Sequence, residues 1–237
     1  MQDALQILAL AQETASGERI GLRGLFIKSL DVFTVLLITG SVAAVALIVR
    51  SALDIRTSKI LPDSSVERAD LLLTEDRIGE LRNFAQGDKT FVGAVLRPAL
   101  EAGPHGREAV REAADIAASE ETARWFRKIE PLQLIGNLGP LVGLAGTVWG
   151  MILAFTSLSE TGGQAGPADL SLGISKALFH TLMGLMLAIP CLLVFGIYRA
   201  AVDRICTRGI SVTARLIERL PAEPHHPSQS GRADRAA

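Results

Sequence analysis

Long uncharged stretches alternate with polar segments along this chain. Residues 32–49 contain 18 residues without a charge, and residues 132–159 contain 28. A third stretch, 170–198, is apolar apart from one lysine and one histidine. A helix that crosses a membrane needs about 20 predominantly apolar residues, and the three stretches approach or exceed that length. The pattern therefore predicts an all-α membrane protein whose three spanning helices cover 32–49, 131–158 and 170–198.

The polar segments complete the predicted organisation. Leucines at helical spacing within residues 1–31 are typical of an amphipathic helix that lies at the membrane surface. Mixed charges over 50–130 indicate a helical domain, with helices near 65–84 and 107–129 separated by glycine-containing loop signals. The second of these helices is expected to run directly into the second span. We expect a connection at 159–169, a further helix at 199–220 and a disordered tail at 221–237.

The positions of lysine and arginine predict the orientation in the membrane. Basic residues follow the first span, precede the second and follow the third, whereas the connection 159–169 contains neither lysine nor arginine. By the positive-inside rule this connection lies outside, and the 50–130 domain and the C-terminus are cytoplasmic. The N-terminus then lies outside, although Arg19, Arg23 and Lys28 before the first span oppose that assignment. We expect no cleaved signal peptide.

Composition narrows the classes of function. The chain of 237 residues is 49% hydrophobic, its mean hydropathy is +0.32, and its net charge of −1 gives no basic field for nucleic acid. No phosphate-binding glycine loop is present, and the two cysteines do not stand in a reactive arrangement. His225 and His226 lack a second pair of metal ligands. We therefore expect no cofactor, no metal site and no enzyme activity.

Five glycines recur at helical spacing in the second uncharged stretch. They lie three or four residues apart, which places all of them on one side of a helix. A stripe of small residues on a spanning helix lets a second backbone approach closely. The sequence thus predicts tight packing of the second span along these positions: Gly136, Gly139, Gly143, Gly146 and Gly150.

Two threonines are the next feature of the spans. Thr147 lies within the glycine-striped helix, and Thr181 lies in the third span. A threonine in a membrane helix commonly bonds to the carbonyl four residues earlier, and this is the simpler interpretation of both. The alternative is that the two hydroxyls line a polar conduit between helices.

Lys176 and His180 are the ionisable residues inside the third span. None of the three spans contains an aspartate or glutamate. Lys176 can extend its ammonium to the outer interface, and His180 can be a satisfied interior group. Because the two lie four residues apart on one helix face, they also offer two potential cations to an ion path or to a partner. A carboxylate from another polypeptide is their expected complement.

The second and third spans resemble the two signature blocks of the ExbB/TolQ/MotA proton-channel family, and they are closest to ExbB and TolQ. The first block is GPLVGLAGTVWGMI at 139–152. The second block contains Gly173-Ile174, Ala177-Leu178, Thr181, Gly184-Leu185 and Ala188-Ile189-Pro190. The three-span layout also favours ExbB and TolQ, because MotA proteins have four spans.

This resemblance implies a ring of five subunits in a bacterial inner membrane, around a single-span partner of the ExbD or TolR type. The partner's membrane aspartate would carry the proton, and Thr147 and Thr181 would face it across the pore. In such a ring, the glycine stripe is expected to pack against neighbouring copies. The N-terminus would be periplasmic and the C-terminus cytoplasmic. Proton flow would then drive mechanical work for outer-membrane transport or another envelope process.

One departure from the family pattern leaves other functions open. ExbB and TolQ carry a glutamate where this chain has Lys176, and a small residue where it has His180. The reversed charge motivates a second hypothesis, a scaffold or regulatory paralogue that keeps the ring but does not conduct protons. A third hypothesis is a motor for motility.

Overall fold

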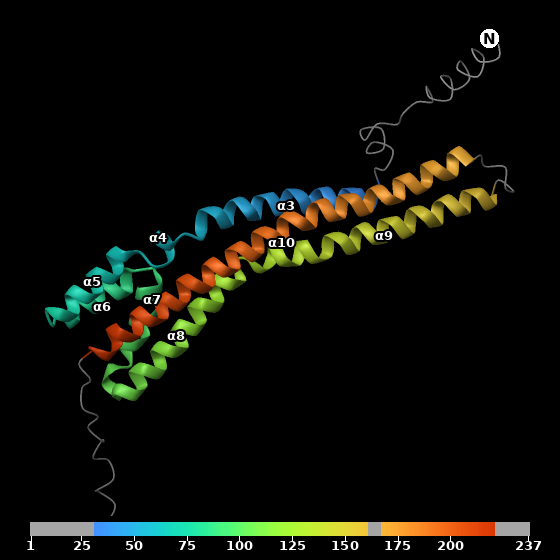
Figure 1. The fold of residues 1–237 in the computed structure, drawn as a ribbon. Helices are drawn as coiled ribbons and strands as arrows, with labels where there is room; N and C mark the ends of the chain where they lie inside the picture. Colours follow the sequence, from blue (N-terminus) through green and yellow to red (C-terminus); the bar gives the residue numbers. More distant parts are fainter. Residues whose placement is uncertain (1–30, 161–166, 221–237) are drawn as a thin grey trace, which may run out of the picture. The chain divides into compact units, whose positions relative to one another are not determined.

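The computed structural model describes residues 31–160 and 167–220. Within these two ranges every regular element is a helix, and no strand occurs (Figure 1). The predicted surface helix at 1–31 and the predicted disordered tail lie outside the described residues, apart from Asp31. Most of the predicted outer connection also lies outside them.

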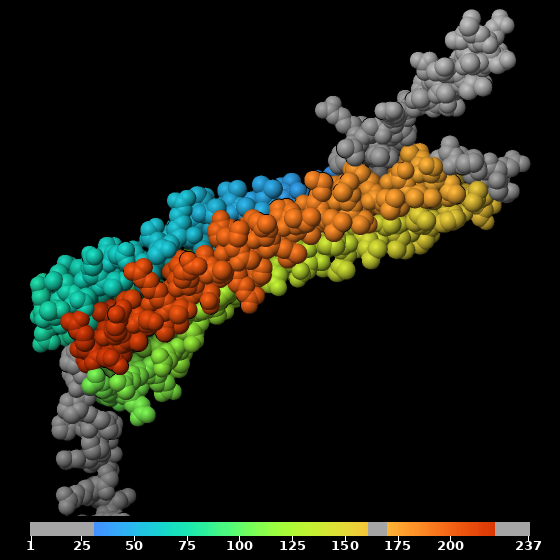
Figure 2. All heavy atoms as spheres, in the orientation of Figure 1, coloured from blue at the N-terminus to red at the C-terminus, as the bar shows by residue number. Residues whose placement is uncertain are grey.

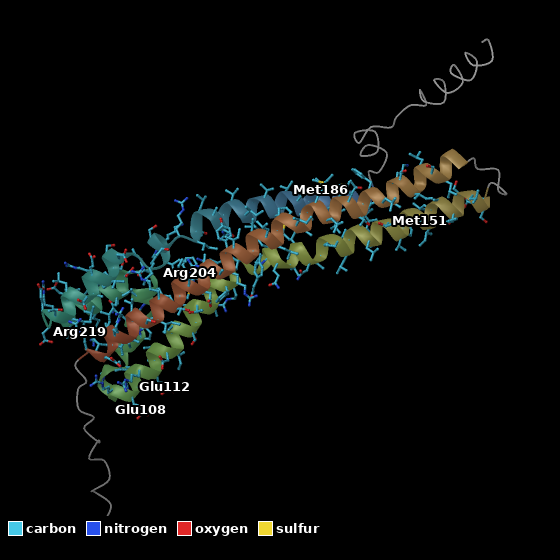
Figure 3. All side chains as sticks on the ribbon, in the orientation of Figure 1. Glu108, Glu112, Met151, Met186, Arg204 and Arg219 are labelled. Carbon is cyan, nitrogen blue, oxygen red and sulfur yellow. The ribbon has the colours of Figure 1, made fainter. Side chains whose placement is uncertain are left out.

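Among the residues that the structure describes, three helices are long and apolar enough to cross a membrane, as the charge pattern predicts. They are α3 (Val32–Asp54), α9 (Glu130–Glu160) and α10 (Pro167–Glu218). Many large apolar side chains on these helices are exposed, and Met186 on α10 is 68% exposed (Figure 3). Such exposure of large apolar side chains matches a lipid or protein environment better than water.

Shorter helices occupy the predicted cytoplasmic domain. They are α4 (Thr57–Ile60), α5 (Asp63–Thr74), α6 (Ile78–Gly87), α7 (Phe91–Glu101), the 3₁₀ turn η1 (Gly103–His105) and α8 (Arg107–Arg127). The helix expected near 65–84 is divided, because Asp76 adopts a left-handed backbone conformation with φ of 55° between α5 and α6. The helix expected near 107–129 corresponds to α8, which two residues separate from α9.

The chain divides into two compact units. The three-helix unit comprises the described residues of 1–44 and 134–191 and is built from parts of α3, α9 and α10. Its small core is lined by Leu37, Ala44, Leu187 and Cys191. The helical-domain unit comprises 45–133 and the described residues from 192 onward.

The helical-domain unit has the larger core, and α7 lies at its centre. Phe91, Val92, Val95 and Leu96 of this helix are all fully buried. Ion pairs fix the end of α10 within the unit, where the Arg219 guanidinium binds the carboxylate of Asp70 and donates to the Thr74 hydroxyl at 2.8 Å.

Candidate functional site

Glycines bring α9 and α10 into backbone contact within the three-helix unit. A Cβ atom on Gly143 would lie 2.7 Å from the carbonyl oxygen of His180 and 3.0 Å from the Cα of Thr181. Figure 2 shows the atoms of α10, in orange, lying directly against the yellow-green atoms of α9. Residues without a side chain are therefore required at this contact, as the packing of spanning helices by small residues predicts.

The glycine stripe packs against α10 of the same chain. Gly139 faces Gly184, Gly146 faces the His180 ring, and Gly150 faces Ala177. Gly136 is buried as well. At four of the five positions, Gly139, Gly143, Gly146 and Gly150, the close neighbour is the third span of the same subunit. Contact of the stripe with neighbouring copies stays a prediction.

This contact brings the hydroxyls of Thr147 and Thr181 together. The two Oγ1 atoms are hydrogen-bonded to each other. Thr147 Oγ1 also lies 3.0 Å from the Gly143 carbonyl and 3.1 Å from the Ala177 carbonyl, while Thr181 Oγ1 lies 3.4 Å from the Gly143 carbonyl. The bond of Thr147 to the carbonyl four residues earlier is thus present, and so is a polar pair between two helices.

The two donor hydrogens of this threonine pair are used inside the chain. A hydroxyl has one hydrogen and two lone pairs. One hydrogen lies between the two hydroxyls, and the other has a carbonyl of Gly143 or Ala177 as its acceptor. The remaining capacity of the pair is to accept hydrogen bonds. Because both threonines are only partly buried in the subunit, a donor from outside the chain can reach them.

His180 is almost completely buried, with 2% of its surface exposed. Its Nε2 lies 3.0 Å from Asp31 Oδ1 and 3.1 Å from Thr34 Oγ1. The ring of Phe33 meets the imidazole edge to face at 6.4 Å. The expected complement of His180 was a carboxylate of another polypeptide, and the structure instead supplies Asp31 of the same chain.

Lys176 lies one helical turn before His180 and is partly exposed. Among the residues that the structure describes, no carboxylate forms an ion pair with it. The structure thus does not join Lys176 to the Asp31–His180 pair, and its role as an ion-path residue or a partner contact stays a prediction.

Asp31 and Thr34 are site residues that the sequence interpretation missed. Asp31 directly precedes the first uncharged stretch and Thr34 lies within it, and neither was singled out. The signal that points to them is the position of a capping aspartate three residues before a threonine, where its Oδ1 accepts the Thr34 backbone N–H at 2.9 Å. That spacing predicts a helix start but gives no information about His180.

A pocket of about 300 Å³ in the helical-domain unit is lined by four basic residues together with Asp54, Ser51 and apolar side chains. Its lining includes Arg50, Arg124, Arg127 and Lys128, which the sequence predicts to lie on the cytoplasmic side of the first two spans. Burial lowers the pKa of Lys128, and the neighbouring Arg124 lowers it further. The Lys128 ammonium lies 3.3 Å from the centre of the Trp125 ring, a contact that favours the charged form.

No group of three or more metal-ligating side chains gathers within residues 31–160 and 167–220. The two cysteines in these ranges, Cys191 and Cys206, are free and buried. The three-helix unit presents a hydroxyl pair at the α9–α10 contact and a His–Asp pair between α10 and the residue before α3.

The sequence matches the MotA/TolQ/ExbB proton channel family over residues 85–209. It is 35% identical over 148 residues to the Tol-Pal system protein TolQ of Pseudomonas aeruginosa, an alignment that covers 62% of this chain and 57% of TolQ. It is also 35% identical over 137 residues to the biopolymer transport protein ExbB-like 1 of Synechocystis, covering 57% of this chain and 51% of that one.

The chain thus spans little more than half the length of these curated relatives. Among solved structures, one of C. jejuni MotAB is similar, with a TM-score of 0.49 and 16% identity, over 95% of this chain and 96% of that one.

Proposed function

The chain belongs to the MotA/TolQ/ExbB proton channel family, and from this premise we propose that it is a membrane motor subunit that couples proton flow to mechanical work. In this proposal five copies form a ring around a single-span partner of the ExbD or TolR type. The subunit lies in a bacterial inner membrane with its N-terminus periplasmic and its C-terminus cytoplasmic. The work serves outer-membrane transport or another envelope process.

The hydroxyl pair of Thr147 and Thr181 is the observation that supports this proposal. The pair joins α9 to α10, and the α9 sequence from 132 to 159 contains no charge. A polar pair in an otherwise apolar helix contact can form a hydrogen bond with a group that comes from another chain. The partner's aspartate is that group in the proposal, since the spans from 32, 132 and 170 contain no carboxylate of their own.

The remaining hydrogen-bonding capacity of the pair sets which form of the carboxyl group it favours. Both threonine hydrogens have acceptors within the chain, so the pair can only accept a hydrogen bond from the partner's carboxyl group. Only a protonated carboxyl group can donate one. Hydrogen bonds to the neutral form of an acid favour that form. Thr147 and Thr181 would thus stabilise the proton-loaded aspartate and let it cross the apolar contact without a charge.

To test the proposal, the full chain is co-expressed with the single-span protein encoded beside it, and uncoupler-sensitive proton uptake is measured in membrane vesicles. Thr147→Val and Thr181→Val are expected to lose uptake. Thr156→Val is the matched control, because Thr156 lies on α9 and bonds to the Ile152 carbonyl at 2.9 Å but is exposed and outside the pair. Wild-type uptake in both test variants would overturn the pore assignment.

A second candidate function is a ring subunit that assembles with the partner without conducting protons. The observation that favours it is Lys176, which stands where ExbB and TolQ carry a glutamate and which has no ion-pair partner among the described residues. The Lys176→Glu variant tests it. If this variant leaves partner binding and coupling unchanged while uncouplers abolish function, the scaffold hypothesis fails.

A third candidate, a motor for motility, differs only in the process that receives the work. The partner's domain outside the membrane decides between these processes. A peptidoglycan-binding or receptor-binding domain would favour an envelope function.

A further inference from the structure

His180 is held by a carboxylate and a hydroxyl that both come from the start of α3. The Asp31 Oδ1 atom accepts the Thr34 backbone N–H at 2.9 Å and lies 3.0 Å from His180 Nε2. Because Asp31 Oδ1 already accepts one N–H, it acts as a carboxylate acceptor towards the His180 ring nitrogen as well. The hydrogen between Asp31 and His180 therefore belongs to Nε2, which donates to Asp31.

This assignment determines what the other ring nitrogen does. With the hydrogen on Nε2, a neutral His180 has a lone pair on Nδ1. Nδ1 is buried and has no hydrogen-bond partner. A histidine that only positions a helix normally has both nitrogens satisfied, because an unpaired buried polar atom costs stability. Nδ1 is thus a free basic site inside the three-helix unit.

A proton that arrives at Nδ1 converts the ring to an imidazolium, whose positive charge faces the Asp31 carboxylate. An opposite charge at this distance favours the charged form of a histidine. Asp31 is 34% exposed at its side chain, whereas His180 is 2% exposed, so the pair connects the partly exposed face of the subunit with its interior. The pair thus has a basic site at Nδ1, a counter-charge at Asp31 and, once Nδ1 is protonated, a hydrogen on Nε2 that can pass to the partly exposed carboxylate.

We propose that Asp31 and His180 form a proton-binding site of this subunit, and that this site hands protons along the route on which the threonine pair lies. The proposal rests on the proposed function for the existence of that route. It differs from the family pattern, in which the acid belongs to the partner, because here an acid and a base of this chain take part.

The two sites lie at the same height along the α9–α10 contact. Gly146 faces the His180 ring, and its neighbour Thr147 bonds to Thr181, which directly follows His180. A substituent at Gly146 would press on the imidazole, since a Cβ there would lie 2.9 Å from the His180 ring carbon Cγ. The absence of a side chain at Gly146 thus leaves room for the His180 imidazole next to the threonine pair.

Few other charges act on the His180 ring. On α10, Lys176 lies one turn away and opposes a second positive charge. Neither the uncharged stretch of α9 nor α3 up to Val49 contributes an ionisable group, so Asp31 is the only acid that faces the ring from the described helices of this unit. Asp31 is therefore the counter-charge of the His180 ring among these side chains.

A first experiment measures the ring itself and needs no partner. The full chain is labelled with ¹⁵N-histidine and placed in nanodiscs, and the His180→Gln variant identifies the His180 signal among the four histidines. We expect a hydrogen on Nε2 in the neutral ring and a change to the doubly protonated ring as the pH is lowered. In Asp31→Asn that change moves to lower pH. A ring with one protonation state throughout, or no effect of Asp31→Asn, overturns the proposal.

A second experiment measures proton flux through vesicles that contain the chain and its co-expressed single-span partner. Glutamine can still donate to Asp31 but cannot take up a proton, so His180→Gln is expected to lower flux by about a hundredfold. The exchanged pair, Asp31→His with His180→Asp, is expected to recover flux. His105→Gln is the matched control, because His105 is exposed and belongs to the other unit.

The outcomes separate this proposal from the proposed function. Wild-type flux in His180→Gln together with lost flux in Thr147→Val overturns the His–Asp site and keeps the threonine route. Lost flux in His180→Gln together with wild-type flux in Thr147→Val overturns the threonine route and the hand-over of protons along it, and keeps the proton-binding His–Asp site. If the unmodified complex carries no flux, the proposed function fails, and the nanodisc titration alone decides whether His180 binds a proton.

Discussion

Gly184 of α10 and Gly139 of α9 face each other so closely that a Cβ on Gly184 would lie 2.5 Å from the Gly139 carbonyl oxygen. The obstacle is backbone, which cannot rotate away as the end of a flexible side chain can. The contact therefore sets how near α9 and α10 approach within the three-helix unit. It also influences the distance between Thr147, about two turns from Gly139 on α9, and Thr181, about one turn from Gly184 on α10.

The Gly184→Ala variant is expected to separate the two helices and to lower the free energy of unfolding by about 1–3 kcal/mol. Gly196→Ala is the matched control on the same helix, since a Cβ there meets nothing within 4 Å. The control is expected to gain about 1 kcal/mol from the better helix propensity of alanine. Thermal unfolding in detergent measures both. Equal stability of the two variants would show that the close contact does not exist.

Glu121 anchors Trp125 in the helical-domain unit. Its carboxylate accepts the Trp125 indole N–H at 2.8 Å, and both side chains are buried. Glu121→Ala leaves that donor without a partner and is expected to cost about 1–3 kcal/mol. Glu121→Gln keeps an acceptor oxygen and is expected to cost clearly less. Chemical denaturation followed by tryptophan fluorescence measures the difference, and equal losses in the two variants would contradict the role of this bond.

Cys206 is expected to resist thiol reagents in the folded protein. It is 1% exposed, and burial raises the pKa of its thiol above the ordinary value, with Glu121 and Asp203 adding to the shift and Thr122 opposing it. A raised pKa means less reactive thiolate at any given pH. In a Cys191→Ala background, maleimide at pH 8.5 should label the chain only after unfolding. Rapid labelling of the folded chain would show that this core opens.

The spans were predictable because their signal is local. An uncharged stretch of sufficient length predicts a spanning helix without any knowledge of its neighbours. The glycine stripe likewise predicted a close helix contact, but spacing along one helix contains no information about which helix approaches. The structure identifies α10 as that neighbour, and family resemblance had suggested a second copy.

The Asp31–His180 pair was missed because its members lie 149 positions apart in the chain. Periodicity reports which residues share a face of one helix, whereas this pair depends on how α3 packs against α10. Asp31 also lies at the end of an apolar stretch, where a charged residue normally faces the membrane–water interface.

The helix α7 was missed for a different reason. Its buried positions Phe91, Val92, Val95, Leu96 and Ala99 repeat at helical spacing, so the signal is present in the sequence. It is short and lies between the charged segments of a domain that was interpreted as two longer helices. A window of 11 residues, the length of α7, contains this repeat.

Proton flux through vesicles that contain the chain and its single-span partner is the most direct test of the threonine route. Because the two hydroxyls bond to each other, they are expected to act as one unit. Thr147→Val, Thr181→Val and the double variant should therefore lose flux to the same extent, while Thr156→Val conducts normally. Wild-type flux in the double variant would contradict the account.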